Sequence, residues 1–242
     1  MDYASAVASA PEGWRHFELA DVQRLPASAR SRALAAVPPQ ELKLLESGDE
    51  PARERVRRAL FWTLVYHLEP DRWEQLAQVE PIHPGLLDAL PHEARRAIDV
   101  GAGTGRLTAH LVERCREVIA VEPVLGMARI LQEKVVTAHA VAAWAEALPI
   151  PDGWSDLTIA CGAFGPEPAI LDEMFRVTKG DGLIALISPE QPEVFESMGW
   201  RRVSLEPRPA PIHEGWIDEF FGPLDPPHEM VFQKLDQARA AR

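Results

Sequence analysis

The chain of 242 residues contains only two cysteines, Cys115 and Cys161. Two isolated cysteines provide neither a disulfide framework nor the paired spacing of a zinc site, and this scarcity favours a reducing, cytoplasmic location. No cluster of His, Cys and carboxylate residues has metal-ligand spacing, so the sequence predicts no metal. No segment approaches the ~18 apolar residues needed to span a bilayer, and residues 1–14 lack the pattern of a secretion signal. We therefore expect no membrane partner.

Positive charge is also scarce. The 25 Lys and Arg residues are outnumbered by 37 Asp and Glu residues, which gives a formal net charge of −12. The one Arg-rich patch, residues 53–58 ("RERVRR"), is interrupted and lies in a helical pattern, so we interpret it as a solvated face. A nucleic-acid partner is disfavoured, because neutralising phosphates requires a net positive surface.

Apolar residues make up 46% of the chain, enough for a proper core. Residues 27–79 show helical patterns, and we predict an N-terminal helical cap over residues 1–79, followed by a core over residues 80–242. The helix expected at 49–70 has its apolar stripe on one face, and its second half is apolar all round. Two interpretations stay open: this half is sandwiched between two layers of core, or its spare face covers a ligand pocket.

From Ile82 onward, short apolar runs alternate with helical patterns. The runs 97–100, 118–121, 157–161 and 183–187 are almost continuously apolar, which is typical of parallel strands covered on both faces. Two further strands are expected near residues 200–207 and 229–235. This alternation predicts an α/β fold with an open, doubly wound sheet.

Three glycines follow the first of these strands, in the stretch "AIDVGAGTGRLTAHL" (residues 97–111). Gly101, Gly103 and Gly105 form the exit of that strand, where ligands bind in open parallel sheets. A helix beginning near Thr104 would direct free N–H groups there and favour an anionic group. The next strand ends in Glu122, and a carboxylate at that place accepts hydrogen bonds from ribose hydroxyls.

The glycine spacing argues against a dinucleotide. The G-x-G-x-x-G pattern places its third glycine at position 106, which is Arg106 here. The sequence reads D-x-G-x-G-x-G instead, with Asp99 two residues before the first glycine.

This stretch resembles the first signature of class I S-adenosylmethionine-dependent methyltransferases that act on small molecules. "VEPVLGMARI" (121–130) resembles the second signature, "AEALPIPDGWSDLTIAC" (145–161) the third, and "FRVTKGDGLIALI" (175–187) the turn into the fifth strand. The resemblance implies a Rossmann-like, mostly parallel, seven-stranded sheet and S-adenosylmethionine as the cofactor. It implies cofactor contacts by the following residues: Asp99, Gly101, Ala102, Gly103, Gly105, Glu122, Pro123, Met127, Trp144, Ala145, Glu146 and Cys161.

One position departs from the family pattern. Trp144 stands where the family has an Asp that accepts a hydrogen bond from the adenine amino group. Ala145 still supplies a backbone N–H, Glu146 is an alternative acceptor, and Trp144 is expected to cover the ring by stacking.

The predicted activity is transfer of a methyl group from S-adenosylmethionine to a small-molecule acceptor by in-line displacement. No catalytic base stands out. The weak candidates are His83, His213 and Glu214, and for His83, which precedes Pro84, a helix cap is the stronger interpretation. Two alternatives stay open: a catalytically inactive methyltransferase fold that serves as a scaffold or partner protein, and a nucleotide-dependent oxidoreductase. The sequence also leaves open a homo-oligomer.

Overall fold

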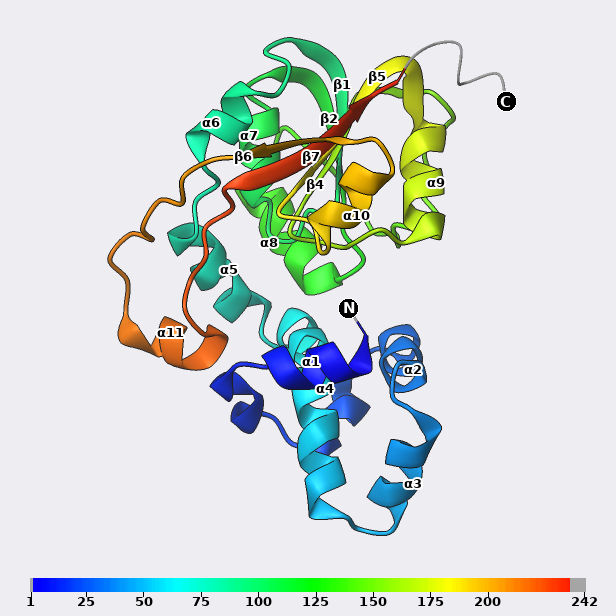
Figure 1. Cartoon of the computed structure of the whole chain (residues 1–242), viewed down its shortest axis with the longest axis vertical. Helices are drawn as coiled ribbons and strands as arrows, with labels where there is room; N and C mark the ends of the chain where they lie inside the picture. Colours follow the sequence, from blue (N-terminus) through cyan, green and yellow to red (C-terminus); the bar gives the residue numbers. More distant parts are fainter. Residues whose placement is uncertain (1, 236–242) are drawn as a thin grey trace. The chain divides into compact units, whose positions relative to one another are not determined.

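The computed structural model describes residues 2–235 and divides into two compact units (Figure 1). The first comprises Met1–Val79 with Pro211–Leu224, and the second comprises Glu80–Ala210 with Asp225–Arg242. The sequence-based boundary assigned all of residues 80–242 to one core, whereas the structure groups Pro211–Leu224 with the helical unit. Residue 1 of the predicted cap and residues 236–242 of the predicted core lie outside the described residues.

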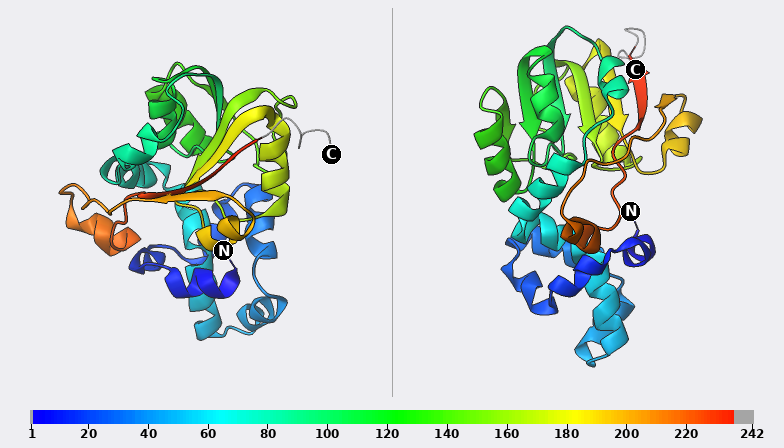
Figure 2. Two further views of the ribbon diagram at one scale, coloured as in Figure 1. Left: turned by 45° about the horizontal axis from the view of Figure 1, so that its top comes forward. Right: turned by 90° about the vertical axis from the view of Figure 1, so that its left-hand side faces the viewer.

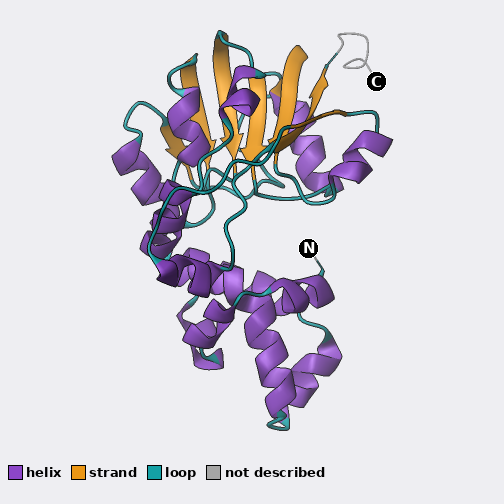
Figure 3. Ribbon diagram, turned by 60° about the vertical axis from the view of Figure 1, so that its left-hand side comes forward, coloured by secondary structure: helices purple, strands orange, loops and turns teal. Residues whose placement is uncertain are grey.

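The described part of the first unit is built from helices and contains no strand (Figure 3). Its elements are α1 (Tyr3–Ser9), η1 (Glu12–His16), η2 (Leu19–Arg24), α2 (Ala27–Ala35), α3 (Pro39–Glu46), α4 (Glu50–Leu68), α5 (Pro70–Val79) and α11 (Gly215–Phe221). The longest helix, α4, begins after Asp49, whose side chain accepts a hydrogen bond from Ala52 N at 2.7 Å. That bond satisfies one of the free N–H groups of the first turn.

Helix α4 forms the centre of this unit. Phe61 and Val65 lie off the apolar stripe that the sequence pattern predicts for this helix. Both are nevertheless completely buried, together with Leu64. No residue from 55 to 70 is exposed, and α4 packs against α1, α2, α3, α5, η1 and η2. This packing supports the sandwiched interpretation of the helix.

The arginines of residues 53–58 are all ion-paired. Their partners are glutamates: Arg53 with Glu50, Arg55 with Glu41, Arg57 with Glu18, and Arg58 with Glu54. The patch therefore presents paired charges rather than a free basic stripe.

Helix α11 lies in the chain between the last two strands but packs on η1 of the first unit (Figure 2). Phe220 and Phe221 of α11 are buried, and their rings lie 5.5 and 6.5 Å from that of Phe61. Apolar aromatic side chains thus explain why residues 211–224 group with the helical unit.

The second unit contains a seven-stranded sheet in the order β3-β2-β1-β4-β5-β7-β6. Its strands are β1 (Ala94–Val100), β2 (Cys115–Val121), β3 (His139–Val141), β4 (Ser155–Cys161), β5 (Thr178–Ile187), β6 (Arg201–Ser204) and β7 (Glu229–Lys234). The first five strands pair in parallel, and β7 is antiparallel to both neighbours. The predicted Rossmann-like, mostly parallel sheet is confirmed. Strand order reverses between β1 and β4, the position at which such sheets bind ligands.

Both faces of this sheet are covered by helices (Figure 3). The helices are α6 (Pro84–Asp88), α7 (Arg106–Leu111), α8 (Leu125–Lys134), α9 (Pro168–Val177) and α10 (Pro192–Ser197). Neighbouring residues of β1 alternate between the two cores: Ala97 packs with α6 and α7, and Ile98 with α9 and α10. The sequence patterns did not identify β3, α10 or the shortness of α7. No helix within residues 2–235 combines the length and apolar character needed to cross a bilayer.

Candidate cofactor site

The glycine loop follows β1 at the carboxyl edge of the sheet. The register pairs Val100 with Val121, so the loop and Glu122 leave adjacent strands side by side. The φ values of Gly101, Gly103 and Gly105 are +70°, +56° and +90°. Residues that carry a Cβ rarely adopt such positive φ values, whereas glycine does so readily. A Cβ at Gly101 would lie 2.8 Å from Cβ of Ala163, in the segment after β4. The glycines therefore permit both the turn and its close approach to that segment.

Glu122 is 5% exposed and is bonded to the loop. One carboxylate oxygen accepts from Gly103 N at 2.8 Å, and the other from Val124 N at 2.8 Å. Burial raises the pKa of Glu122, and the two N–H donors oppose that shift. Each oxygen keeps a further lone pair, so the carboxylate can also accept from a ligand hydroxyl.

Asp99 is 1% exposed at the end of β1. Its Oδ2 accepts from the hydroxyl of Thr108 on α7 at 2.6 Å. Within residues 2–235, neither Asp99 Oδ1 nor the buried hydroxyl of Thr104 has a hydrogen-bond partner. Burial raises the pKa of Asp99 to about 7, against the hydrogen bond from Thr108. Buried polar atoms without a partner require an explanation, and a bound water, ion or ligand is one.

Arg106 connects the glycine loop to two other segments. Its guanidinium donates to the side-chain and backbone oxygens of Glu80, at 2.6 and 2.7 Å, and lies 3.7 Å from Sγ of Cys161 at the end of β4. Burial raises the pKa of Cys161 to about 11, so its thiol is neutral near pH 7. Sequence reasoning used Arg106 only to disfavour a dinucleotide and did not connect it to Glu80. Their link was missed because 26 residues separate them.

Helix α7 differs from the expectation of an anion-binding helix start. It begins at Arg106 rather than near Thr104 and is only six residues long. The N–H of Gly103 is already bonded to the Glu122 carboxylate. The protein thus supplies its own negative charge at the loop.

The remaining predicted cofactor contacts lie on the segments that follow β2 and β3. Pro123 follows Glu122, and Met127 is buried in the first turn of α8. Trp144, Ala145 and Glu146 lie, half-buried, in the connection between β3 and β4, where Ala147 N donates to Trp144 O at 3.1 Å. Because β3 is the neighbour of β2, this connection leaves the sheet at the same edge as Glu122.

The structure gives His83 a local structural role. Its Nδ1 accepts from Gly85 N at 3.0 Å, and His83 is the N-cap of α6, as the capping interpretation predicts. Among the described residues, no group of three or more His, Cys, Asp and Glu side chains is arranged to hold a metal ion.

His213 and Glu214 belong to the first unit. The ring nitrogens of His213 lie 2.8 Å from the carbonyl of Pro211 and 3.1 Å from the carboxylate of Asp218. The backbone carbonyl, and then Asp218, raise the pKa of His213, which favours the protonated ring over a free base. Glu214 accepts from Trp216 Nε1 at 2.9 Å.

Comparison with known proteins identifies the domain. Residues 97–182 match the family model of a methyltransferase domain. An uncharacterized methyltransferase of Mycobacterium tuberculosis is 36% identical over 115 residues, covering 47% of this chain and 46% of that protein. A malonyl-[acyl-carrier protein] O-methyltransferase of Serratia marcescens is 27% identical over 144 residues, covering 57% of this chain and 52% of that protein. The chain thus spans about half the length of these curated relatives.

A solved structure shares the fold. It is a chain of the complex between the Haloferax volcanii Trm112 methyltransferase activator and a candidate methyltransferase. The match has a TM-score of 0.51 at 13% identity and covers 71% of this chain and 96% of that one. The resemblance found in the sequence is confirmed for this part of the chain: residues 97–182 form a methyltransferase domain.

Proposed function

We propose that the second unit binds S-adenosylmethionine at the glycine loop and Glu122 and transfers its methyl group to a small-molecule acceptor. One observation carries the proposal: the buried carboxylate of Glu122 is bonded to the N–H of Gly103 in a positive-φ glycine loop. A carboxylate at that place accepts bonds from ribose hydroxyls, and its bond to Gly103 N occupies a loop N–H group that a pyrophosphate would otherwise use. This arrangement suits an aminoacyl nucleoside better than a dinucleotide.

The unpaired atoms of the loop fit the same cofactor. Asp99 Oδ1 and the hydroxyl of Thr104 are buried without partners among the described residues. The ammonium group of an aminoacyl chain is a donor that an ionised Asp99 attracts. A ligand that satisfies such atoms removes the cost of leaving them unpaired.

The proposed roles of the protein are binding, orientation and exclusion of water. S-adenosylmethionine supplies the methyl group on a sulfonium, so the difficult chemistry belongs to the cofactor. Glu122 holds the ribose, Met127 and Trp144 cover the adenine, and Ala145 N–H donates to the ring. Cys161 ends β4, and Arg106 lies beside it. In the sheet, β4 and β2, the strand before Glu122, lie on opposite sides of β1. We propose that the acceptor approaches on the β4 side, where orientation in line with the methyl group lowers the barrier.

Isothermal titration calorimetry with S-adenosylmethionine, S-adenosylhomocysteine and NADH tests the cofactor assignment. We expect micromolar binding of the first two ligands and none of NADH. Binding of NADH alone would favour the oxidoreductase alternative, and absence of all binding would contradict the cofactor assignment.

Release of S-adenosylhomocysteine in the presence of candidate acceptors tests catalysis. Malonyl-acyl carrier protein belongs in that panel beside small carboxylic acids, phenols and amines, because one relative is named for its methylation. Cofactor binding with no turnover on any member of a broad panel would favour the scaffold alternative.

A further inference from the structure

The connection between β3 and β4 has no regular secondary structure, although it carries three of the proposed adenine contacts. It comprises residues 142–154, with Trp144, Ala145 and Glu146 near its start. Two backbone hydrogen bonds lie within it, from Ala147 N to Trp144 O and from Ile150 N to Leu148 O, and its other buried N–H and C=O groups need partners from elsewhere. A connection of this length that holds one conformation must therefore be fixed by contacts outside itself.

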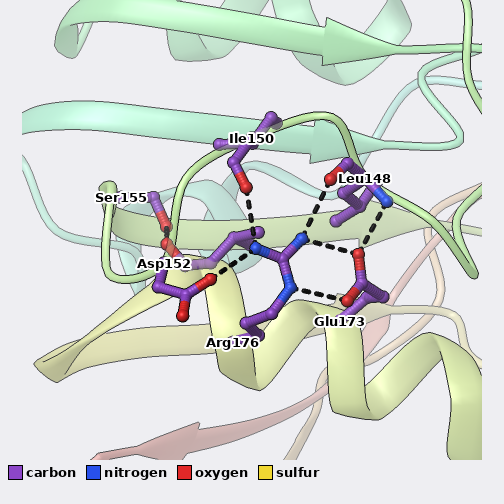
Figure 4. A network of polar contacts seen from close by, with 7 residues as sticks. Leu148, Ile150, Asp152, Ser155, Glu173 and Arg176 are labelled. Carbon is purple, nitrogen blue, oxygen red and sulfur yellow. Dashed lines mark hydrogen bonds and ion pairs between the residues drawn. The ribbon is translucent and has the colours of Figure 1, made fainter.

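Two charged side chains of α9 provide those contacts (Figure 4). Arg176 donates to the carbonyls of Leu148 and Ile150, at 2.9 and 2.8 Å, and to the carboxylate of Asp152 at 2.7 Å. Glu173 accepts from Leu148 N at 2.7 Å and also from Arg176, at 2.6 and 2.7 Å. The backbone of α9 adds one more bond, from Gly153 N to the carbonyl of Arg176 at 2.8 Å.

The geometry of this contact requires both charges. The five donors of a guanidinium lie in one plane, so Arg176 spans two carbonyls and two carboxylates at once, which a lysine cannot do. The hydrogen bond from Arg176 lowers the pKa of Glu173, so this carboxyl is ionised near neutral pH. The side chains of Leu148 and Ile150, each 4% exposed, are anchored in the core beneath.

We propose that the Glu173–Arg176 pair is a positioning device for the adenine side of the cofactor site. Only Ala147 separates the turn at Trp144–Glu146 from Leu148, whose N–H and C=O are both bound by the pair. The Glu173–Arg176 pair therefore sets the positions of Trp144 and of the N–H of Ala145. The inference rests on the proposed binding of S-adenosylmethionine.

The test compares Arg176→Gln with a matched control, Arg202→Gln. Both arginine side chains are 32% exposed, and each pairs with two carboxylates, but Arg202 contacts Glu196 and Glu229 and no part of the connection. Calorimetry measures the Kd of S-adenosylhomocysteine and of 5′-methylthioadenosine, which has the nucleoside but lacks the aminoacyl chain. We expect Arg176→Gln to weaken both ligands by the same factor, about tenfold, since loss of one net hydrogen-bonded or stacked contact has that size. Arg202→Gln should leave both Kd values unchanged.

A double variant tests whether the Glu173–Arg176 pair acts through the turn at Trp144–Glu146. In a Trp144→Ala background, Arg176→Gln should add much less than tenfold, because residues that act in one unit are not additive. If Arg176→Gln does not fold, Glu173→Gln replaces it, because that variant loses the carboxylate but retains the bonds from Arg176 to the two carbonyls.

Three results would overturn the inference. The first is a lowered thermal midpoint with unchanged Kd values, which would leave the pair a purely structural role. The second is a loss confined to S-adenosylhomocysteine, which would place the effect at the aminoacyl end. The third is equal loss in the Arg202→Gln control. Failure of the unmodified protein to bind either ligand would instead contradict the proposed function itself.

Discussion

The two units treat charge and apolar packing differently. In the helical unit, the arginines of α4 are paired with glutamates, and in each pair at least one side chain is more than a third exposed. In the sheet unit, Asp99 and Glu122 are almost completely buried and bonded to neutral donors. Exposed ion pairs contribute little to stability, whereas a buried carboxylate without a bonded cation is costly. The comparison therefore separates paired charges at the surface from buried carboxylates for which we propose a role in cofactor binding.

The apolar cores differ as well. The first unit buries an aromatic cluster around Phe61, whose ring lies 4.8 Å from that of Trp62 and 5.5 Å from that of Phe220. The second unit buries mainly aliphatic residues on the two faces of its sheet. Without a ladder of strands, the helical unit depends on side-chain packing for its specific fold.

The largest expected effect is on that cluster. Phe61→Ala should lower the free energy of unfolding by about 3–5 kcal/mol, since it removes a completely buried ring and leaves a cavity. Urea denaturation followed by circular dichroism measures the loss. Leu44→Ala is the control, because Leu44 is exposed in the same unit. A loss below about 1 kcal/mol would show that the cluster does not hold the helical unit together.

The next effect concerns Asp99 and depends on pH. Its folded pKa of about 7 lies above the ordinary value of 3.8, so folding favours the protonated acid. This group therefore contributes fully below about pH 4, and its contribution is lost as the pH rises to about 7. Above about pH 4, the free energy of unfolding of Asp99→Asn should therefore exceed that of the parent. The difference should grow up to about pH 7 and reach roughly 4 kcal/mol at most, because each pKa unit corresponds to about 1.36 kcal/mol. Denaturation curves at pH 4, 5.5 and 7.5 test this, and a difference that does not change with pH would refute it.

Glu122 gives the third effect, on binding rather than folding. Glu122→Ala should weaken S-adenosylhomocysteine by about 1–3 kcal/mol in calorimetry, because the ribose hydroxyls lose their acceptor. Glu117→Ala is the control: Glu117 lies on β2, five residues before Glu122, but pairs with Arg96 in a partly exposed ion pair. Equal affinity in parent and Glu122→Ala would mean that the ribose lies elsewhere.

The smallest effect is expected at the paired surface charges of the helical unit. Arg53→Gln should change the free energy of unfolding by less than about 0.5 kcal/mol, because its pair with Glu50 is exposed. The same urea titration measures it. A loss of more than about 1 kcal/mol would remove the distinction drawn between the charges of the two units.

Much of the candidate site was predictable because its signals are local. The glycines fix the turn through their positive φ values, and apolar runs mark the strands that bring Asp99 and Glu122 to one edge of the sheet. His83 beside Pro84 was also interpretable as a helix cap, since capping involves only the next two residues. The sequence left the short β3 and α10 undetected, because three to six residues carry too little periodicity.

The sequence by itself determined the alternation of the longer strands and helices, the glycine loop and the acid that follows the neighbouring strand, because backbone preference and apolar period act over a few residues. The tertiary structure alone decided which groups meet. In the folded chain, Glu122 is hydrogen-bonded to Gly103, Arg106 to Glu80, and Arg176 to the carbonyl of Leu148. Residues Pro211–Leu224 group with the helical unit. These partners are 19 or more residues apart, so their pairing depends on how the whole chain packs and not on any local pattern.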